Sequence, residues 1–148
     1  MKSTPLFAAA LLALSACSST GTSTTPQPVA ATPKAAFTHA IEGRETAKGS
    51  FIGTTKHTTT GHASVFRSNG QWFVSLASDF SFSGAPSPKV AFGANGYRPD
   101  AAIAPLSSNN GASVYAVPAS LDVGDFNEIW IWCDQVGIPL GLAELSLT

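Results

Sequence analysis

Residues 63–77 read ASVFRSNGQWFVSLA, and this stretch decides the class of fold. At its centre stands Asn69-Gly70, the dipeptide most typical of a two-residue β-hairpin turn. Apolar side chains alternate along the second arm, which places Trp72, Val74 and Leu76 on one face of an extended chain. The stretch therefore predicts two antiparallel strands. They are Ala63–Arg67 and Gln71–Ala77.

Short apolar segments separated by glycine and proline continue along the rest of the chain. Further predicted strands are Gly49–Ile52, Lys89–Phe92, Ala112–Val117, Glu128–Cys133 and Leu142–Leu147. This region shows no helical periodicity, and the segments that contain Asp100, Asp122 and Asp125 are interpreted as loops. We predict an all-β fold: a single antiparallel β-sandwich or small barrel of about seven or more short strands.

The first 16 residues have the layout of a secretory signal peptide. Lys2 precedes an apolar run at Leu6–Leu14, which is shorter than the about 20 residues that a spanning helix needs. A cysteine follows where the mature chain would begin, which resembles a bacterial lipobox. We expect lipidation of Cys17 and attachment to the membrane of the cell envelope through that lipid. Ser18 favours the periplasmic face of the outer membrane over the inner membrane.

The sequence divides into three parts. Residues 1–16 are the predicted signal peptide, residues 17–47 the lipidated cysteine and a flexible tether, and residues 48–148 the β domain. The tether is rich in Ser, Thr, Pro and Ala and has no acidic residue between Ser18 and Lys34. Such a composition buries too little apolar surface to offset the entropy of ordering the chain.

Composition excludes several classes of function. The chain has 8 basic and 9 acidic residues and no basic run, so we expect no nucleic-acid partner. Its single methionine is Met1, which removes Met-ligated haem or copper from consideration. No nucleophile elbow, phosphate-binding loop, dinucleotide fingerprint or Cys-x-x-Cys motif is present. We therefore expect no enzyme, and the sequence identifies no cofactor.

Cys133 is the most informative residue of the β domain, because it is the only thiol left once Cys17 carries a lipid. It can be a small buried apolar side chain or a redox-active thiol. In the strand Glu128–Cys133 it shares a face with the two isoleucines, and Trp130 and Trp132 occupy the other face. The indoles either fill a core, relay an electron or wall off a flat ligand.

Two histidines, His57 and His62, lie in a segment that is interpreted as a turn before a strand. Together with Cys133 they contain ligand types that zinc or copper accepts. Their five-residue separation does not match helical ligand spacing, and no histidine follows Cys133 as in blue-copper loops. We expect exposed or capping histidines and no metal site.

Laid end to end, these segments resemble the DM-thirteen domain family, a β-rich extracellular module often found beside DOMON domains. The resemblance covers about Lys48 to Leu147. The motifs that carry it are Gly49-Ser50-Phe51, His57 with Gly61, Asp79-Phe80, Gly84-Ala85-Pro86, Leu106, Tyr115-Ala116-Val117-Pro118, Phe126, Ile131-Trp132-Cys133 and Gly141-Leu142-Ala143-Glu144-Leu145. The chain departs from the family pattern at Ala85-Pro86-Ser87, where the family has Gly-Pro-Asp.

The resemblance implies a membrane-anchored accessory electron-transfer or redox domain. It points to Cys133 as the redox group, with His57, Trp132 and Trp130 as supporting candidates. A lone thiol cannot run a two-thiol cycle, so this function needs a redox protein partner, a bound cofactor or another copy of the chain. The alternative is a non-catalytic binding or scaffolding lipoprotein in which Cys133 only packs.

Overall fold

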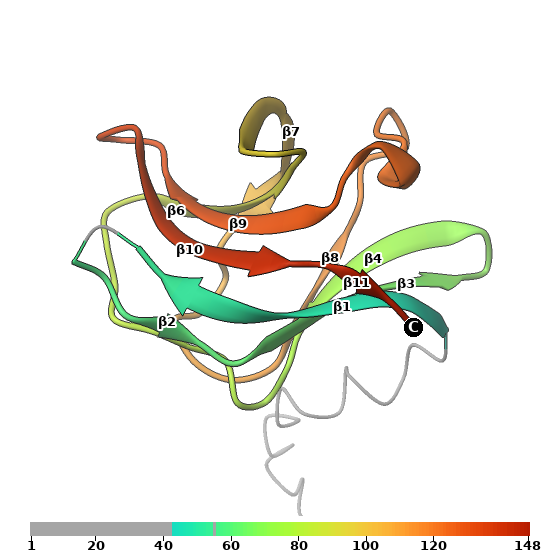
Figure 1. Ribbon diagram of the computed structural model, residues 1–148, viewed down its shortest axis with the longest axis horizontal. Coiled ribbons are helices and arrows are strands. Elements are labelled where there is room, and N and C mark those ends of the chain that lie inside the picture. The colour runs from blue at the N-terminus through green and yellow to red at the C-terminus, as the bar shows by residue number, and fades with distance from the viewer. Residues whose placement is uncertain (1–42, 55) are drawn as a thin grey trace, which may run out of the picture. The chain divides into compact units, whose positions relative to one another are not determined.

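The computed structural model describes residues 43–54 and 56–148. The predicted signal peptide, Cys17 and nearly all of the tether lie outside these residues. The described part folds as strands with one turn of 3-10 helix, Val123–Asp125 (Figure 1). The strands are β1 Arg44–Gly53, β2 Thr59–Thr60, β3 His62–Ser68, β4 Gln71–Leu76, β5 Ser81–Phe82, β6 Pro88–Gly93, β7 Tyr97–Pro105, β8 Ser113–Ala116, β9 Glu128–Cys133, β10 Ile138–Glu144 and β11 Ser146–Leu147. Across these ranges no helix is long and apolar enough to cross a membrane.

The main sheet curls into a nearly closed barrel (Figure 1). Its strands follow the order β7-β6-β9-β10-β1-β3-β4-β8, and all pairs are antiparallel. The two end strands, β7 and β8, approach each other without a ladder of hydrogen bonds. A second, two-stranded sheet pairs β2 with β5. The predicted all-β antiparallel architecture is confirmed.

Strand β1 joins the two halves of the barrel. Along residues 44–50 it pairs with β3, and along Phe51–Gly53 it pairs with β10. Strand β11 continues the β10 side by pairing with Ala47 and Lys48. At Gly49, a Cβ atom would lie 2.2 Å from the carbonyl oxygen of Glu144, so only glycine allows this close approach.

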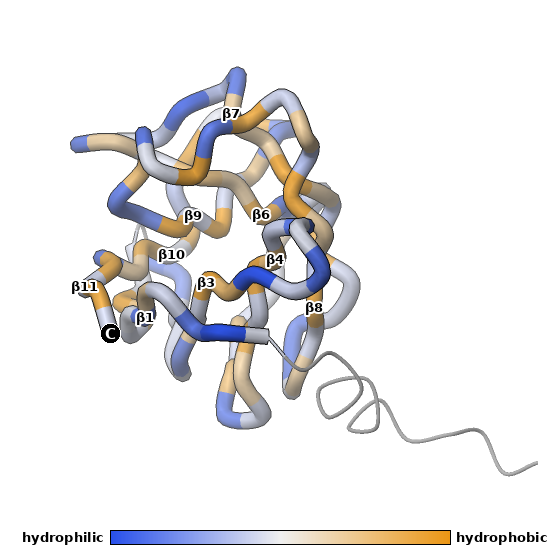
Figure 2. Tube along the Cα trace, turned by 90° about the vertical axis from the view of Figure 1, so that its right-hand side faces the viewer, coloured by the Kyte–Doolittle hydropathy of each residue, from blue (hydrophilic) through white to orange (hydrophobic). Residues whose placement is uncertain are grey.

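The β3–β4 hairpin forms as its sequence predicts. Asn69 and Gly70 have φ angles of 49° and 81°, the left-handed values that a tight hairpin turn of this type requires. Val74 and Leu76 are fully buried on the inner face. Apolar residues from the other strands meet them there. Along the trace, the strands carry hydrophobic positions, drawn in orange, among more polar ones (Figure 2).

Three segments differ from the sequence expectation. Asp100 lies in strand β7 and not in a loop, because an edge strand tolerates the neighbouring Pro99 and charged side chains that would disrupt a central one. Strand β10 begins at Ile138, ahead of the expected start, and the register shifts between Pro139 and Gly141. Strand β1 begins at Arg44, ahead of the predicted domain start.

Replacing Ile131 by alanine tests the central position of β9. Ile131 is fully buried, and its truncation is expected to lower the free energy of unfolding by about 2–5 kcal/mol. The matched control is Ile52→Ala, because Ile52 is 71% exposed and its loss should change stability by less than about 0.5 kcal/mol. Urea unfolding measures both values, and equal losses would contradict this description of the core.

Candidate functional site

Cys133 is the last residue of β9, the strand that lies between β6 and β10. Its backbone is opposite Pro88 on one side and Ile138 on the other. The side chain is 0% exposed and belongs to the core cluster together with Ile129 and Ile131. The face predicted for the sulfur is therefore confirmed, and its thiol is not in a disulfide.

A surface loop covers the sulfur of Cys133. The thiol donates a hydrogen bond to the carbonyl oxygen of Pro86, with Sγ 2.9 Å from the oxygen. The next amide, that of Asp134, donates to the carbonyl oxygen of Ser87 at 3.3 Å. Pro86 and Ser87 are themselves exposed, so the thiol lies close beneath the surface of the loop. Ser87 has a φ of 46°, a left-handed value that is uncommon for serine, and it lies where the chain departs from the family pattern.

The outer face of β9 carries an aromatic cluster. Trp130 and Trp132 are partly buried there, and their rings meet edge to face with centroids 6.4 Å apart. Tyr97, from the start of β7, stacks on Trp132 with ring centroids 3.9 Å apart and planes 2° from parallel. The Nζ atom of Lys89 lies 5.7 Å from the centroid of the Tyr97 ring. Tyr97 thus covers a tryptophan that would otherwise face solvent.

Glu128 fixes one end of this aromatic cluster. Its carboxylate is largely buried and accepts hydrogen bonds from the indole nitrogen of Trp130 and from the amide of Gly96, each at 2.8 Å. A Cβ atom at Gly93 would lie 2.3 Å from that indole nitrogen, so the position requires glycine. The β6–β7 turn and the Trp130 ring are therefore held by one acidic side chain.

A pocket of about 460 Å³ lies beside the loop that covers Cys133. Lys89 and Asp134 form an ion pair at its wall, with Nζ 2.5 Å from the carboxylate oxygen. Burial disfavours the charged ammonium, but hydrogen bonds to Asp134 and Tyr97 outweigh it and raise the pKa of Lys89. The remaining lining residues are Ser87, Pro88, Ala102, Ile103, Ala104 and Pro105.

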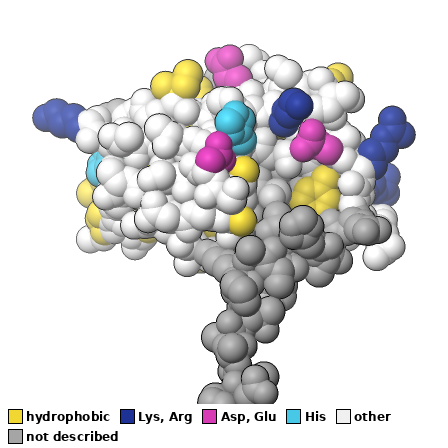
Figure 3. All heavy atoms as spheres, turned by 90° about the horizontal axis from the view of Figure 1, so that it is seen from below, with side chains coloured by type: hydrophobic (Ala, Val, Ile, Leu, Met, Phe, Trp, Pro, Cys, Tyr) yellow, Lys and Arg dark blue, Asp and Glu magenta, His cyan; other side chains and the backbone are white. Residues whose placement is uncertain are grey.

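The structure does not bring the two histidines to Cys133. His57 lies on the loop between β1 and β2, where its ring centroid is 6.0 Å from that of Phe82. His62 begins β3 and binds the carboxylate of Asp79, and this hydrogen bond lowers the pKa of Asp79. In the described ranges no three His, Cys, Asp or Glu side chains are grouped closely enough to hold a metal ion. On the face drawn in Figure 3, acidic, basic and histidine side chains are scattered among uncharged ones.

Sequence reasoning did not find Tyr97, Lys89, Glu128 or Pro86 as members of this site. Tyr97 meets Trp132 only because β6 lies between β7 and β9 in the sheet. The glycines at 93 and 96, which form a tight turn just before Tyr97, are the one local signal that could have pointed to it.

The role of Glu128 can be tested by substitution. Glu128→Ala removes the acceptor of two hydrogen bonds and is expected to lower the free energy of unfolding by about 1–3 kcal/mol, because partly buried donors stay unpaired. It should also change the tryptophan fluorescence. Glu128→Gln keeps an acceptor oxygen and removes a like charge opposite Glu144, so it should be nearly neutral. If both variants lost stability equally, the acceptor role would be wrong.

Comparison with known proteins adds one finding. A family model described as "Electron transfer DM13" matches residues 50–145, which span every strand from β2 to β10 and the end of β1 from Ser50 to Gly53. Neither the curated proteins nor the solved structures gave a match. Since the matched segment covers well over half of the sequence, the chain belongs to the DM13 electron-transfer family.

Proposed function

We propose that this protein is an accessory electron-transfer domain with no enzymatic turnover of its own, and that Cys133 is the group that changes oxidation state. The lipid on Cys17 attaches it to the periplasmic face of the outer membrane. Membership of the electron-transfer family supports a redox role. The observation that carries the assignment to Cys133 is the position of its thiol, which is hydrogen-bonded to a carbonyl oxygen of an exposed loop.

In the closed structure the thiol is protected from reaction. The carbonyl oxygen of Pro86 accepts its hydrogen bond, but an amide oxygen is too weak a base to take the proton. Oxidation therefore requires the loop at Ala85–Ser87 to move and admit water or a partner. The thiol then gives one electron to a one-electron acceptor on a redox protein and its proton to water, which leaves a thiyl radical. A returning electron and proton restore the thiol.

The aromatic cluster gives the partner a place to make contact. Trp132 is adjacent to Cys133 in the chain, and its ring faces outward beneath Tyr97. Stacked indole and phenol rings are among the protein side chains that are easiest to oxidise, so they suit the passage of an electron. Trp130 supports this pair from its edge. His57 has no contact with these groups, and we assign it no part in the step.

The second candidate function is a non-catalytic binding or scaffolding lipoprotein. It is favoured by one observation, the 0% exposure of Cys133 in line with two isoleucines of the core. In that case the sulfur serves only as a small apolar side chain.

Thiol labelling separates the two functions. In the full chain with Cys17→Ser, Cys133 is the sole cysteine. If the loop opens locally, labelling at low urea should proceed with almost no dependence on urea, because local opening exposes little surface. Its rate should exceed the rate expected from global unfolding by at least about tenfold, which corresponds to about 1.4 kcal/mol. Mild peroxide should then add the mass of oxygen to the peptide that contains Cys133, and the corresponding peptide of the Cys133→Ser variant should stay unchanged.

Val74→Cys, made in the Cys17→Ser, Cys133→Ser background, is the matched control. Val74 is equally buried but lies on β4, in the middle of the core. Its thiol should react only through global unfolding, with a steep urea dependence. If Cys133 followed the same steep dependence, the redox role would be wrong and the structural role of the cysteine would remain.

A further inference from the structure

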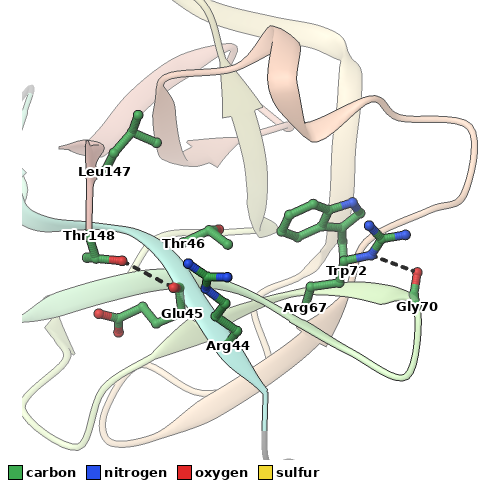
Figure 4. A pocket seen from close by; sticks show the side chains of 8 residues that line it. All are labelled: Arg44, Glu45, Thr46, Arg67, Gly70, Trp72, Leu147 and Thr148. Atoms are coloured by element: carbon green, nitrogen blue, oxygen red, sulfur yellow. Dashed lines mark hydrogen bonds between the residues drawn. The ribbon is translucent and has the colours of Figure 1, made fainter.

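One end of the barrel opens into a pocket of about 560 Å³ that the chemistry above does not use. It lies where the described chain enters β1, at the opposite end of β1 from its pairing with β10. Side chains from β1, β3, β4 and the C-terminal segment line it (Figure 4). Mouths of β-barrels are frequent places for ligands.

Charged side chains line the pocket. They lie on the same face of the sheet as the core residues, one inward-facing position beyond the core. On β3, Val65 faces the core and is opposite Val74, and the next inward position is Arg67, opposite Trp72. On β1, Arg44 is directly opposite Arg67. Arg44, Arg67 and Trp72 therefore form one row across three strands, one layer outside the core.

Arg44 and Arg67 place two positive charges at this pocket. In the part of the chain that the structure describes, neither guanidinium forms an ion pair. Like charges directly opposite each other on a sheet repel and reduce stability. The carboxylate of Glu45 also lines the pocket, but it points away from the guanidinium of Arg44 (Figure 4).

One of the two guanidinium groups is already held in place. The Nε atom of Arg67 donates to the carbonyl oxygen of Gly70 at 3.3 Å, and its guanidinium carbon lies 5.3 Å from the centroid of the Trp72 ring. Among the described residues, the only hydrogen bond recorded for Arg67 uses Nε, which leaves its terminal nitrogens as donors for a ligand. A fixed guanidinium loses less entropy when it binds an anion than a mobile one does.

We propose that this pocket binds a phosphate group. Arg44 and Arg67 occupy directly opposite backbone positions and line the same pocket, although Figure 4 shows their guanidinium groups apart. A phosphate group that draws the side chain of Arg44 toward Arg67 would accept charge-assisted hydrogen bonds from both. The indole of Trp72 and the 90% exposed Leu147 supply apolar surface for the group that carries the phosphate. That group is a lipid or a soluble phosphate ester, and both present the same anion to Arg44 and Arg67.

The binding assay uses residues 17–148 with Cys17→Ser, so that neither acylation nor the apolar run at Leu6–Leu14 attaches the protein to vesicles. Co-sedimentation with phosphatidylglycerol vesicles and with phosphatidylcholine vesicles measures the lipid arm. Titration with inorganic phosphate and with glycerol phosphate, followed by tryptophan fluorescence and calorimetry, measures the soluble arm. Raising the salt concentration should weaken binding in either arm, because salt screens exposed charges.

Arg44→Gln and Arg67→Gln should each weaken binding by about tenfold or more. Arg98→Gln is the matched control, since it makes the same change of charge at the third arginine of the chain, which is paired with Asp100 on β7. It should bind like the parent protein. Glu45→Gln should bind slightly more tightly. Arg44→Gln should also unfold at the same urea concentration as the parent or a higher one, because it removes a repulsion.

Each outcome decides the proposal. Binding to phosphatidylglycerol vesicles but not to soluble phosphates identifies a lipid headgroup, and binding to glycerol phosphate that competes with vesicles identifies a soluble ester. Absence of binding in both arms overturns the site. Equal binding by the variants at 44, 67 and 98 overturns it as well. A loss of stability in Arg44→Gln would show that the arginine pair is structural.

Discussion

The barrel depends on the ability of strand β1 to pair with three other strands. Its first part forms a ladder with β3, its last part forms one with β10, and β11 continues the β10 side. If β1 paired along one edge only, the sheet would separate into two halves, β7-β6-β9-β10 and β3-β4-β8. The backbones approach closely at Gly49, where a side chain would collide with the carbonyl group of Glu144.

Strand β9 shows how one short segment serves two environments. Because side chains alternate along a strand, Ile129, Ile131 and Cys133 enter the core while the two tryptophans face outward. The sulfur is therefore sealed on the inner side and the aromatic rings are available on the outer side. The fold thus places a buried thiol and an outward aromatic cluster within consecutive residues.

Local signals predicted the architecture well, and they failed where long-range pairing decides. The Asn69-Gly70 turn and the alternation of inward and outward side chains along β9 each depend on a few consecutive residues, so both could be identified from the sequence. Strand β7 could not be identified from the sequence, because Pro99 and Asp100 are unfavourable in most strands and acceptable only at the edge of a sheet. The stacking of Tyr97 on Trp132 and the facing of Arg44 and Arg67 depend on strand order and register. No local pattern encodes either contact.

The incomplete closure between β7 and β8 leaves backbone donors and acceptors along two edges, which is the usual route to association between sheets. Strand β7 limits this risk by its own composition. Pro99 offers no amide hydrogen, and the neighbouring Arg98–Asp100 ion pair would lose hydration if another chain docked there. The same residues that made β7 hard to predict from the sequence therefore disfavour the pairing of this open edge with a strand of another molecule.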